Sequence, residues 1–218
     1  MFIGHFALAL AAKKIDPKPS LGTTFLAAQF IDLLWPVFLL SGLEKVEIDP
    51  GNTAFTPLNF VSYPYSHSLL ATMIWGVLFG FIYFLLFKNK GTAVLLGVLV
   101  ISHWFLDLLT HRPDLPLGFA EQTKLGLGLW NNILATIVAE VFIFAAGAYF
   151  YIRSTKAKNK TGSWSLIALL IFLTAIYFMN AFGDPPPNAE AIGYVGLFQW
   201  LLIAWGYWTD RNRTSITS

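Results

Sequence analysis

Six apolar segments, each about as long as a membrane-spanning helix, constrain the fold of this chain more than any other feature. A helix needs roughly 20 residues to cross the hydrocarbon core of a bilayer. We therefore predict an all-α, polytopic membrane helix bundle, with one transmembrane domain over residues 1–209 and a disordered cytoplasmic tail over 210–218. The predicted spans are Leu21–Gly42, Tyr65–Phe87, Gly91–Thr110, Leu129–Ile152, Trp164–Phe182 and Ala191–Thr209.

A shorter apolar segment, Phe2–Ala12, precedes these spans. At about 1.5 Å per residue it reaches only about half-way across a bilayer, so we expect either a half-inserted helix or one lying on the interface. Its lack of a charged leading region argues against a removable signal peptide. Only 12% of the chain is charged, whereas a soluble domain is nearer to about a quarter, which supports the membrane assignment.

Basic residues fall in alternate connecting segments along the chain. Lysines lie between residues 13 and 18, at 88 and 90 and again between 156 and 160, and arginines lie at 211 and 213, whereas the loop over 44–49 is acidic. The positive-inside rule then puts both termini in the cytoplasm. The net charge of +2 gives no indication of a nucleic-acid partner.

Ionisable residues inside the predicted spans are the strongest functional signal, because such groups are costly in lipid and usually mark functional sites. His103, Asp107 and His111 are spaced by four residues, so a helix places them on one face. An imidazole and a carboxylate one turn apart can point at the same metal ion. The chain has no cysteine, which leaves histidines and carboxylates as the available metal ligands.

The predicted heights of these residues in the membrane suggest one site. Counted along each helix from its inner end, His5 lies at about 12 Å, Asp32 at about 16 Å and His103 at about 18 Å, and His67 lies near the outer rim. We expect Asp32, His67, His103 and Asp107 to converge between the middle and the outer surface. Solvated positions for His5 and His67 are the alternatives. Gln29, three residues before Asp32, is placed to orient it.

The order of these residues resembles a known family. The chain carries, in this order, His5, Asp32 within Asp-Leu-Leu-Trp, Ser66-His67-Ser68, and His103-x3-Asp107. Over roughly residues 1–150 this set resembles the YdjM-like bacterial inner-membrane family of metal-dependent hydrolases, which in turn looks like a relative of zinc-dependent phospholipase C. The resemblance implies a first metal site made by Asp32, His67, His103 and Asp107, a neighbouring one at His5, and His111 and Glu140 as further candidates.

The reaction implied is metal-assisted hydrolysis of a phospholipid or a lipid-linked phosphate ester at the outer leaflet. Zinc fits imidazole and carboxylate ligands, lowers the pKa of bound water and polarises an ester oxygen. Asp107 and Glu140 are the candidate catalytic carboxylates. Glu140 could act as a general base, hold a second ion or share a proton with Asp32. Arg112 suits a phosphate group, although an arginine at this interface can also simply extend its head group to water.

Two other functions use the same residues. An ion- or proton-coupled transporter would use the His/Asp set as a pathway, but it requires polar groups across the whole membrane, and the inner halves of the predicted spans contain few. A purely structural role would let the polar residues lock helices together. Such contacts average only about 0.6 kcal/mol, which is little return for so many ionisable groups.

Overall fold

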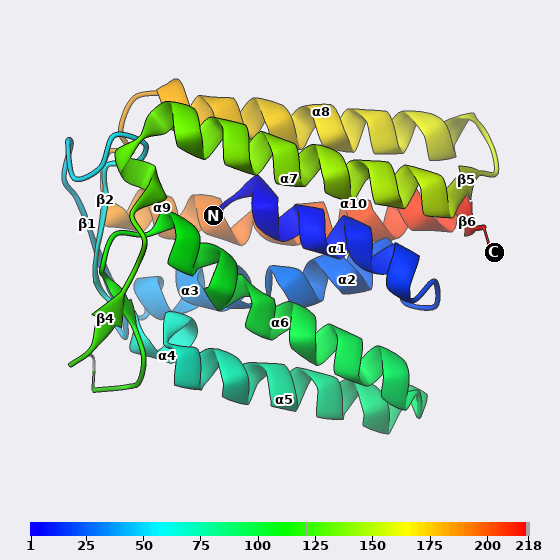
Figure 1. Cartoon of the computed structure of the whole chain (residues 1–218), viewed down its shortest axis with the longest axis horizontal. Coiled ribbons are helices and arrows are strands. Elements are labelled where there is room, and N and C mark those ends of the chain that lie inside the picture. Colours follow the sequence, from blue (N-terminus) through cyan, green and yellow to red (C-terminus); the bar gives the residue numbers. More distant parts are fainter. Residues whose placement is uncertain (121, 217–218) are drawn as a thin grey trace.

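A computed structural model describes residues 1–120 and 122–216, and it shows the predicted all-α architecture (Figure 1). Long helices run side by side along the molecule, and short strand pairs lie at its two ends (Figure 1). The helices are α1 (Ile3–Ile15), α2 (Leu21–Ala28), α3 (Phe30–Leu40), α4 (Pro64–His67), α5 (Leu69–Phe87), α6 (Lys90–Thr110), α7 (Ile133–Ser154), α8 (Lys160–Phe182), α9 (Ala189–Leu197) and α10 (Gln199–Arg211), with the 3-10 turn η1 (Leu129–Asn131) before α7.

Four helices, α5 to α8, are long and apolar enough to cross a membrane. The predicted span Leu21–Gly42 is broken at Gln29 into α2 and α3, whose axes meet at 53°, and it makes a fifth if the pair is counted as one span. The predicted span Ala191–Thr209 is interrupted at Phe198, between α9 and α10. Within the described residues it does not qualify as a span, so the predicted number of six is not confirmed.

One of our two expectations for the segment Phe2–Ala12, that it lies on the interface, was wrong. Helix α1 occupies the middle of the bundle and packs against α2, α6 and α7 (Figure 1). Gly147 of α7 allows the close approach, because a Cβ atom there would lie 2.3 Å from the carbonyl oxygen of Ala7. His5 is only 1% exposed, so the solvated alternative for this residue was wrong.

Helices α5 and α6 form a tight antiparallel hairpin. Lys88 adopts a left-handed conformation, with φ of 54°, and the side chain of Asn89 accepts a hydrogen bond from the Thr92 N–H to cap α6. A Cβ atom on Gly76 would lie 2.8 Å from the carbonyl oxygen of Gly97, so only a residue without a side chain fits there. Small residues of this kind let helix backbones pack closely.

The strands lie at opposite ends of the bundle (Figure 1). At one end β1 (Lys45–Ile48) pairs antiparallel with β2 (Leu58–Ser62), and β3 (Leu115–Pro116) pairs with β4 (Lys124–Leu125). At the other end β5 (Thr155–Ala157) pairs antiparallel with β6 (Arg213–Ser215). The two loops predicted to face outward, over 44–49 and 112–124, thus lie at the same end of the bundle, the end that carries β1 to β4.

The predicted disordered tail is largely ordered. Asp210 and Arg211 complete α10, and the buried Arg213 guanidinium donates to Thr155 and to the Gly162 carbonyl. These hydrogen bonds hold β6 against β5 and remove the expected disorder. Residues 217–218 of the predicted tail, and Glu121 of the predicted outer loop over 112–124, lie outside the described residues.

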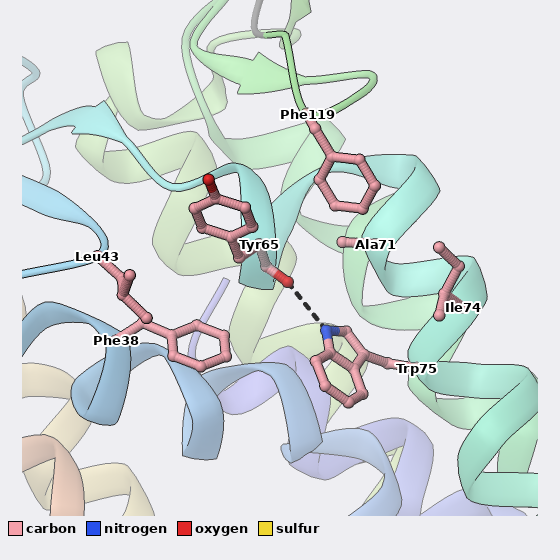
Figure 2. A pocket seen from close by; sticks show the side chains of 7 residues that line it. All are labelled: Phe38, Leu43, Tyr65, Ala71, Ile74, Trp75 and Phe119. Carbon is pink, nitrogen blue, oxygen red and sulfur yellow. Dashed lines mark hydrogen bonds between the residues drawn. The ribbon is translucent and has the colours of Figure 1, made fainter. Parts of the chain in front are cut away.

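An apolar groove of about 290 Å³ opens at the β1–β4 end, between the end of α3, the short α4 and the start of α5 (Figure 2). The Trp75 indole N–H crosses it and donates to the Tyr65 carbonyl oxygen at 2.9 Å. The residues that line this groove include Phe38, Leu43, Tyr65, Ile74, Trp75 and Phe119.

Candidate metal centre

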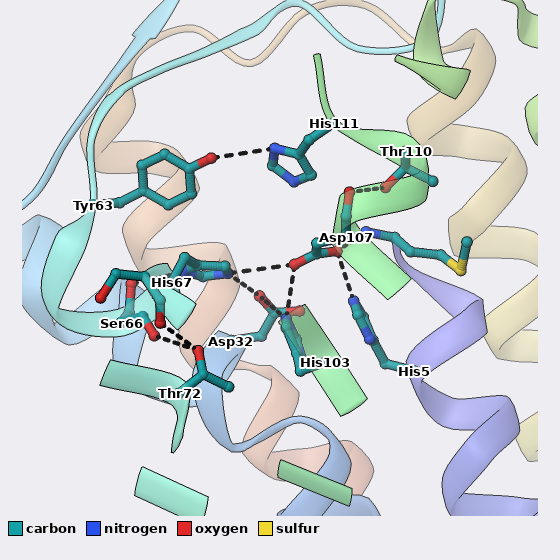
Figure 3. Close-up of polar contacts among 12 residues, drawn as sticks. His5, Asp32, Tyr63, Ser66, His67, Thr72, His103, Asp107, Thr110 and His111 are labelled. Atoms are coloured by element: carbon teal, nitrogen blue, oxygen red, sulfur yellow. Dashed lines mark hydrogen bonds and ion pairs between the residues drawn. The ribbon is translucent and has the colours of Figure 1, made fainter. Parts of the chain in front are cut away.

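Three histidines and two aspartates from α1, α3, α4 and α6 meet inside the bundle (Figure 3). We call them the His/Asp cluster: His5, Asp32, His67, His103 and Asp107. Two overlapping groups within it could each hold a metal ion, His5 with His103 and Asp107, and Asp32 with His67 and His103. In each group the candidate ligand atoms lie within 4.8 Å of one another. The structure therefore brings together side chains up to 102 positions apart in the chain.

Asp107 lies at the centre of the first group. Its Oδ2 is 3.2 Å from His103 Nε2, one helical turn back on α6, and its Oδ1 is 3.1 Å from His5 Nε2 on α1. The amine of Met1 also contacts Oδ1. The rings of His5 and His103 stack at 3.6 Å with an interplanar angle of 3°. The two oxygens of Asp107 thus serve two different imidazoles.

Asp32 completes the second group. Its Oδ1 is 3.3 Å from His67 Nε2 and 3.5 Å from His103 Nε2, so one carboxylate oxygen faces two imidazole nitrogens. His67 Nε2 also lies 3.9 Å from Asp107 Oδ2, which connects the two groups. The Asp32 side chain is 21% exposed, whereas the other four members are at most 5% exposed. The cluster is therefore accessible from its Asp32 side.

The break between α2 and α3 shapes this part of the cluster. Ala28, the last residue of α2, accepts a hydrogen bond from His103 Nδ1 at 2.9 Å, because carbonyls at a helix end lack intrahelical partners. The proton on Nδ1 leaves His103 Nε2 as the free nitrogen that faces both aspartates. Asp32 lies in the first turn of α3, where the positive end of the helix dipole favours a carboxylate.

The same break overturns the role expected for Gln29. Residues three apart share a face only along a continuous helix, and Gln29 lies at the discontinuity itself. Its side-chain amide is fully buried and has no hydrogen-bond partner among the described residues. Gln29 does not orient Asp32.

His67 is positioned by a chain of hydrogen bonds that begins at Glu44. The Glu44 carboxylate accepts from the Tyr65 and Ser66 N–H groups, both at 2.8 Å, and from the Ser66 hydroxyl at 2.6 Å. Because the Ser66 hydroxyl hydrogen points at Glu44, Ser66 Oγ accepts a hydrogen bond from His67 Nδ1 at 2.7 Å. Burial raises the pKa of the Glu44 carboxyl, and the hydrogen bonds from Ser66 oppose that shift. This relay also leaves Nε2 of His67 as the nitrogen that faces the cluster.

The donor set fits a metal ion. His103 Nε2, which faces both aspartates, is buried and has no hydrogen-bond partner of good geometry among the described residues. Buried polar groups are normally satisfied, and such atoms in a native site call for an explanation such as an ion. Histidine ligands to metals usually donate their other ring N–H to a carbonyl or carboxylate, and His103 and the Glu44 relay at His67 match that pattern.

Two of the predicted site residues lie just outside the cluster. His111 is the C-cap of α6, and its N–H still donates to the Asp107 carbonyl, but its ring pairs with Asp114 and not with the cluster. Its Nδ1 is 2.9 Å from Asp114 Oδ1, its ring packs 4.2 Å from that of Trp130, and burial lowers its pKa against the Asp114 hydrogen bond. Arg112 is partly exposed and donates to Asp114 and to Asn59. Neither residue belongs to the two potential metal groups.

Glu140 has a different partner from those expected. It is fully buried on α7, and its Oε2 accepts from the N–H groups of Phe2 and Gly4 at 2.9 and 3.3 Å. The first N–H groups of a helix lack intrahelical partners, so Glu140 caps α1 across the bundle. Capping in this way fixes the position of His5, one residue beyond Gly4.

Glu44, Ser66 and the Ala28 carbonyl position ligands of the cluster, and the sequence did not predict these roles. Glu44 lies in a loop and contributed there only to the charge count, and a backbone carbonyl carries no sequence signal. Nothing among known protein-family models, curated proteins or solved structures matches this chain. The resemblance to YdjM-like proteins thus stays a prediction. What the fold and site define is a helical protein with apolar helices able to cross a membrane and a buried His/Asp cluster able to hold a metal ion.

Proposed function

We propose that this protein is a membrane-embedded, zinc-dependent hydrolase that cleaves a phospholipid or a lipid-linked phosphate ester at the outer leaflet. The observation that carries the proposal is the convergence of two aspartates and three histidines from four separate helices. In this proposal the protein lies in the bacterial inner membrane, has six spans and the short α1, and keeps both termini in the cytoplasm.

Zinc is favoured by the ligand chemistry. Imidazoles and carboxylates are its usual ligands where cysteine is absent, and catalytic sites combine them with an open position for water. When bound, zinc supplies a water of lowered pKa and polarises the phosphoryl oxygen. Asp107 presents separate oxygens to His5 and His103, and these three side chains would hold one ion.

The reaction adds water across one ester bond. The water oxygen forms a new bond to phosphorus, the bond from phosphorus to the leaving oxygen breaks, and a proton from water ends on the leaving alcohol. Asp32, the only cluster member with substantial exposure among the described residues, marks the side from which the ester enters. Glu140 and Arg112 act at a distance from this step, since the former caps α1 and the latter binds Asn59.

A location near the outer leaflet is supported by the end of the bundle at which the cluster lies. His67 belongs to α4, which directly follows β2, and β1 belongs to the acidic loop predicted to face outward. A transporter is less well supported. Between His5 and Lys13 every residue of α1 is apolar, so this central helix offers no polar path to the opposite end.

Metal analysis of the detergent-purified protein tests the proposal. We expect the wild type to retain zinc in stoichiometric amounts and to release phosphate monoester or alcohol from phospholipid vesicles. Asp32→Ala and His103→Ala should lose both properties, whereas the matched control Asp49→Ala, in the loop between β1 and β2, should keep them. A wild type without metal, or variants that keep it, would overturn the proposal.

A further inference from the structure

The apolar groove and the His/Asp cluster share two segments of chain. Leu43 lines the groove, and its neighbour Glu44 begins the relay to His67. Tyr65 lines the groove, and its neighbour Ser66 continues the relay (Figures 2 and 3). Successive residues thus serve the groove and the cluster in turn, so a ligand in the groove lies against the wall that positions His67.

The surface around the groove is the kind that lipid covers. Ile74 lines the groove and is 49% exposed, and it belongs to α5, a potential span that is mostly unburied within the bundle. The groove is lined by apolar and aromatic side chains, and its one polar crossing, the Trp75 indole N–H, is already satisfied by the Tyr65 carbonyl. Among the residues that the structure describes, no charged side chain lines the groove, so none of them offers a headgroup a partner there.

We propose that the groove binds one acyl chain of the membrane glycerophospholipid whose phosphate ester enters the His/Asp cluster. This inference rests on the proposed function and adds a substrate class to it. The bound chain fixes the height of the ester relative to His67, because Leu43 and Tyr65 of the groove are the direct chain neighbours of Glu44 and Ser66, which position His67.

The expected contribution of the groove is position rather than strong affinity. Lipid tails are as apolar as the groove, so moving a tail from bilayer to groove gains only packing contacts. We therefore expect a preference of roughly fivefold over other lipid-facing surface, which corresponds to about 1 kcal/mol. A pocket near 300 Å³ is at the lower limit of ligand sites, so it holds part of one chain.

Photolabelling in proteoliposomes tests the inference. The probe is phosphatidylglycerol with a diazirine near the end of one acyl chain, in vesicles of phosphatidylethanolamine and phosphatidylglycerol. We expect labelling of peptides that contain Tyr65 and Trp75 to exceed labelling at Phe142, an exposed residue of α7, by about fivefold. Ile74→Trp fills the groove and should abolish that excess. Val77→Trp, on the exposed face of α5 but outside the groove, should preserve it.

The outcomes separate the groove from the proposed function when zinc is measured in the same samples. Equal labelling of the groove peptides and of Phe142, in a protein that retains zinc, would overturn the groove as a lipid site and leave the hydrolase proposal standing. Preferential labelling in a protein without metal supports the groove as a lipid site and overturns the hydrolase. A diazirine-bearing polyprenyl phosphate that displaces the phosphatidylglycerol probe from the groove would overturn the choice of an acyl chain. If labelling at Tyr65 and Trp75 in Ile74→Trp exceeded that at Phe142 as much as in the wild type, the groove would be overturned as the binding site.

Discussion

The relay from Glu44 to His67 makes a quantitative prediction about metal affinity. In Glu44→Gln the amide oxygen can still accept from the Tyr65 and Ser66 N–H groups, but an NH2 group replaces the oxygen that lies 2.6 Å from Ser66 Oγ. That NH2 group donates to Ser66, and the Ser66 hydroxyl must then turn and donate to His67 Nδ1. The proton of His67 moves to Nε2, the nitrogen that faces Asp32, where it blocks metal binding.

Restoring the binding tautomer makes Ser66 Oγ accept from both the new amide and His67 Nδ1, which leaves the buried Ser66 hydroxyl hydrogen without an acceptor. An unsatisfied buried group costs about 1–3 kcal/mol, which corresponds to roughly 5- to 150-fold in affinity. Changes to residues that orient a metal ligand typically have an effect of about this size. Rotating the new amide offers no escape, because its NH2 group would then meet the two backbone N–H groups.

The assay is a competition titration of zinc against a chelator of known affinity, on purified Glu44→Gln and on Glu47→Gln as the matched control. Glu47 lies three residues further on, is half exposed and contacts Lys45 on the surface, so its neutralisation should leave zinc affinity unchanged. Burial raises the pKa of Glu44, so the metal-free Glu44→Gln protein should unfold at nearly the wild-type temperature. Wild-type affinity in Glu44→Gln, with Asp32→Ala devoid of metal, would refute the relay.

Three further predictions follow from the packing of α1 and from the cluster. Glu140→Ala removes the acceptor of the N-cap amide Phe2 and of the buried first-turn amide Gly4 and should lower the free energy of unfolding by about 2–4 kcal/mol, whereas Glu140→Gln should retain most of it, as thermal unfolding in detergent would measure. Gly147→Leu should destabilise the protein by at least about 1–3 kcal/mol through overpacking against α1, whereas Gly91→Leu, at an open position of α6, should not; equal unfolding temperatures would contradict the packing. Excess chelator should lower the unfolding temperature of the wild type but not of Asp107→Ala, since a ligand held at about 100 times its Kd contributes about 2.7 kcal/mol; identical shifts would argue against a metal at Asp107.

Hydropathy was sufficient to predict the long helices that run without a break. The predicted span Gly91–Thr110 differs from α6 by one residue at its start, and Tyr65–Phe87 ends where α5 ends. The break at Gln29 could not be predicted in this way, because Gln29 is flanked by apolar residues. The one proline of that span, Pro36, lies inside α3 without breaking it. The interruption at Phe198 likewise carries no glycine or proline at that position.

The same distinction holds for the candidate site: contacts within one helix could be predicted, and contacts between distant segments could not. Spacing within one helix placed His103 and Asp107 together, since the period of an α-helix is fixed. Glu44 and His5 depend instead on how a loop folds back and on how α1 enters the bundle, neither of which a local pattern encodes. The pairing of His111 with Asp114 could not be foreseen from the spacing, because it depends on how the chain turns after the end of α6.

The central position of α1 has a consequence for the biogenesis of the protein. A helix of 13 residues is too short to be recognised and held as a span by itself, and its last turn carries Lys13 and Lys14. Its closest partner, α7, is synthesised more than a hundred residues later. The contacts of α1 with α7, and with them the final position of His5, therefore form only after α7 has been synthesised, so the cluster cannot assemble from the first half of the chain alone.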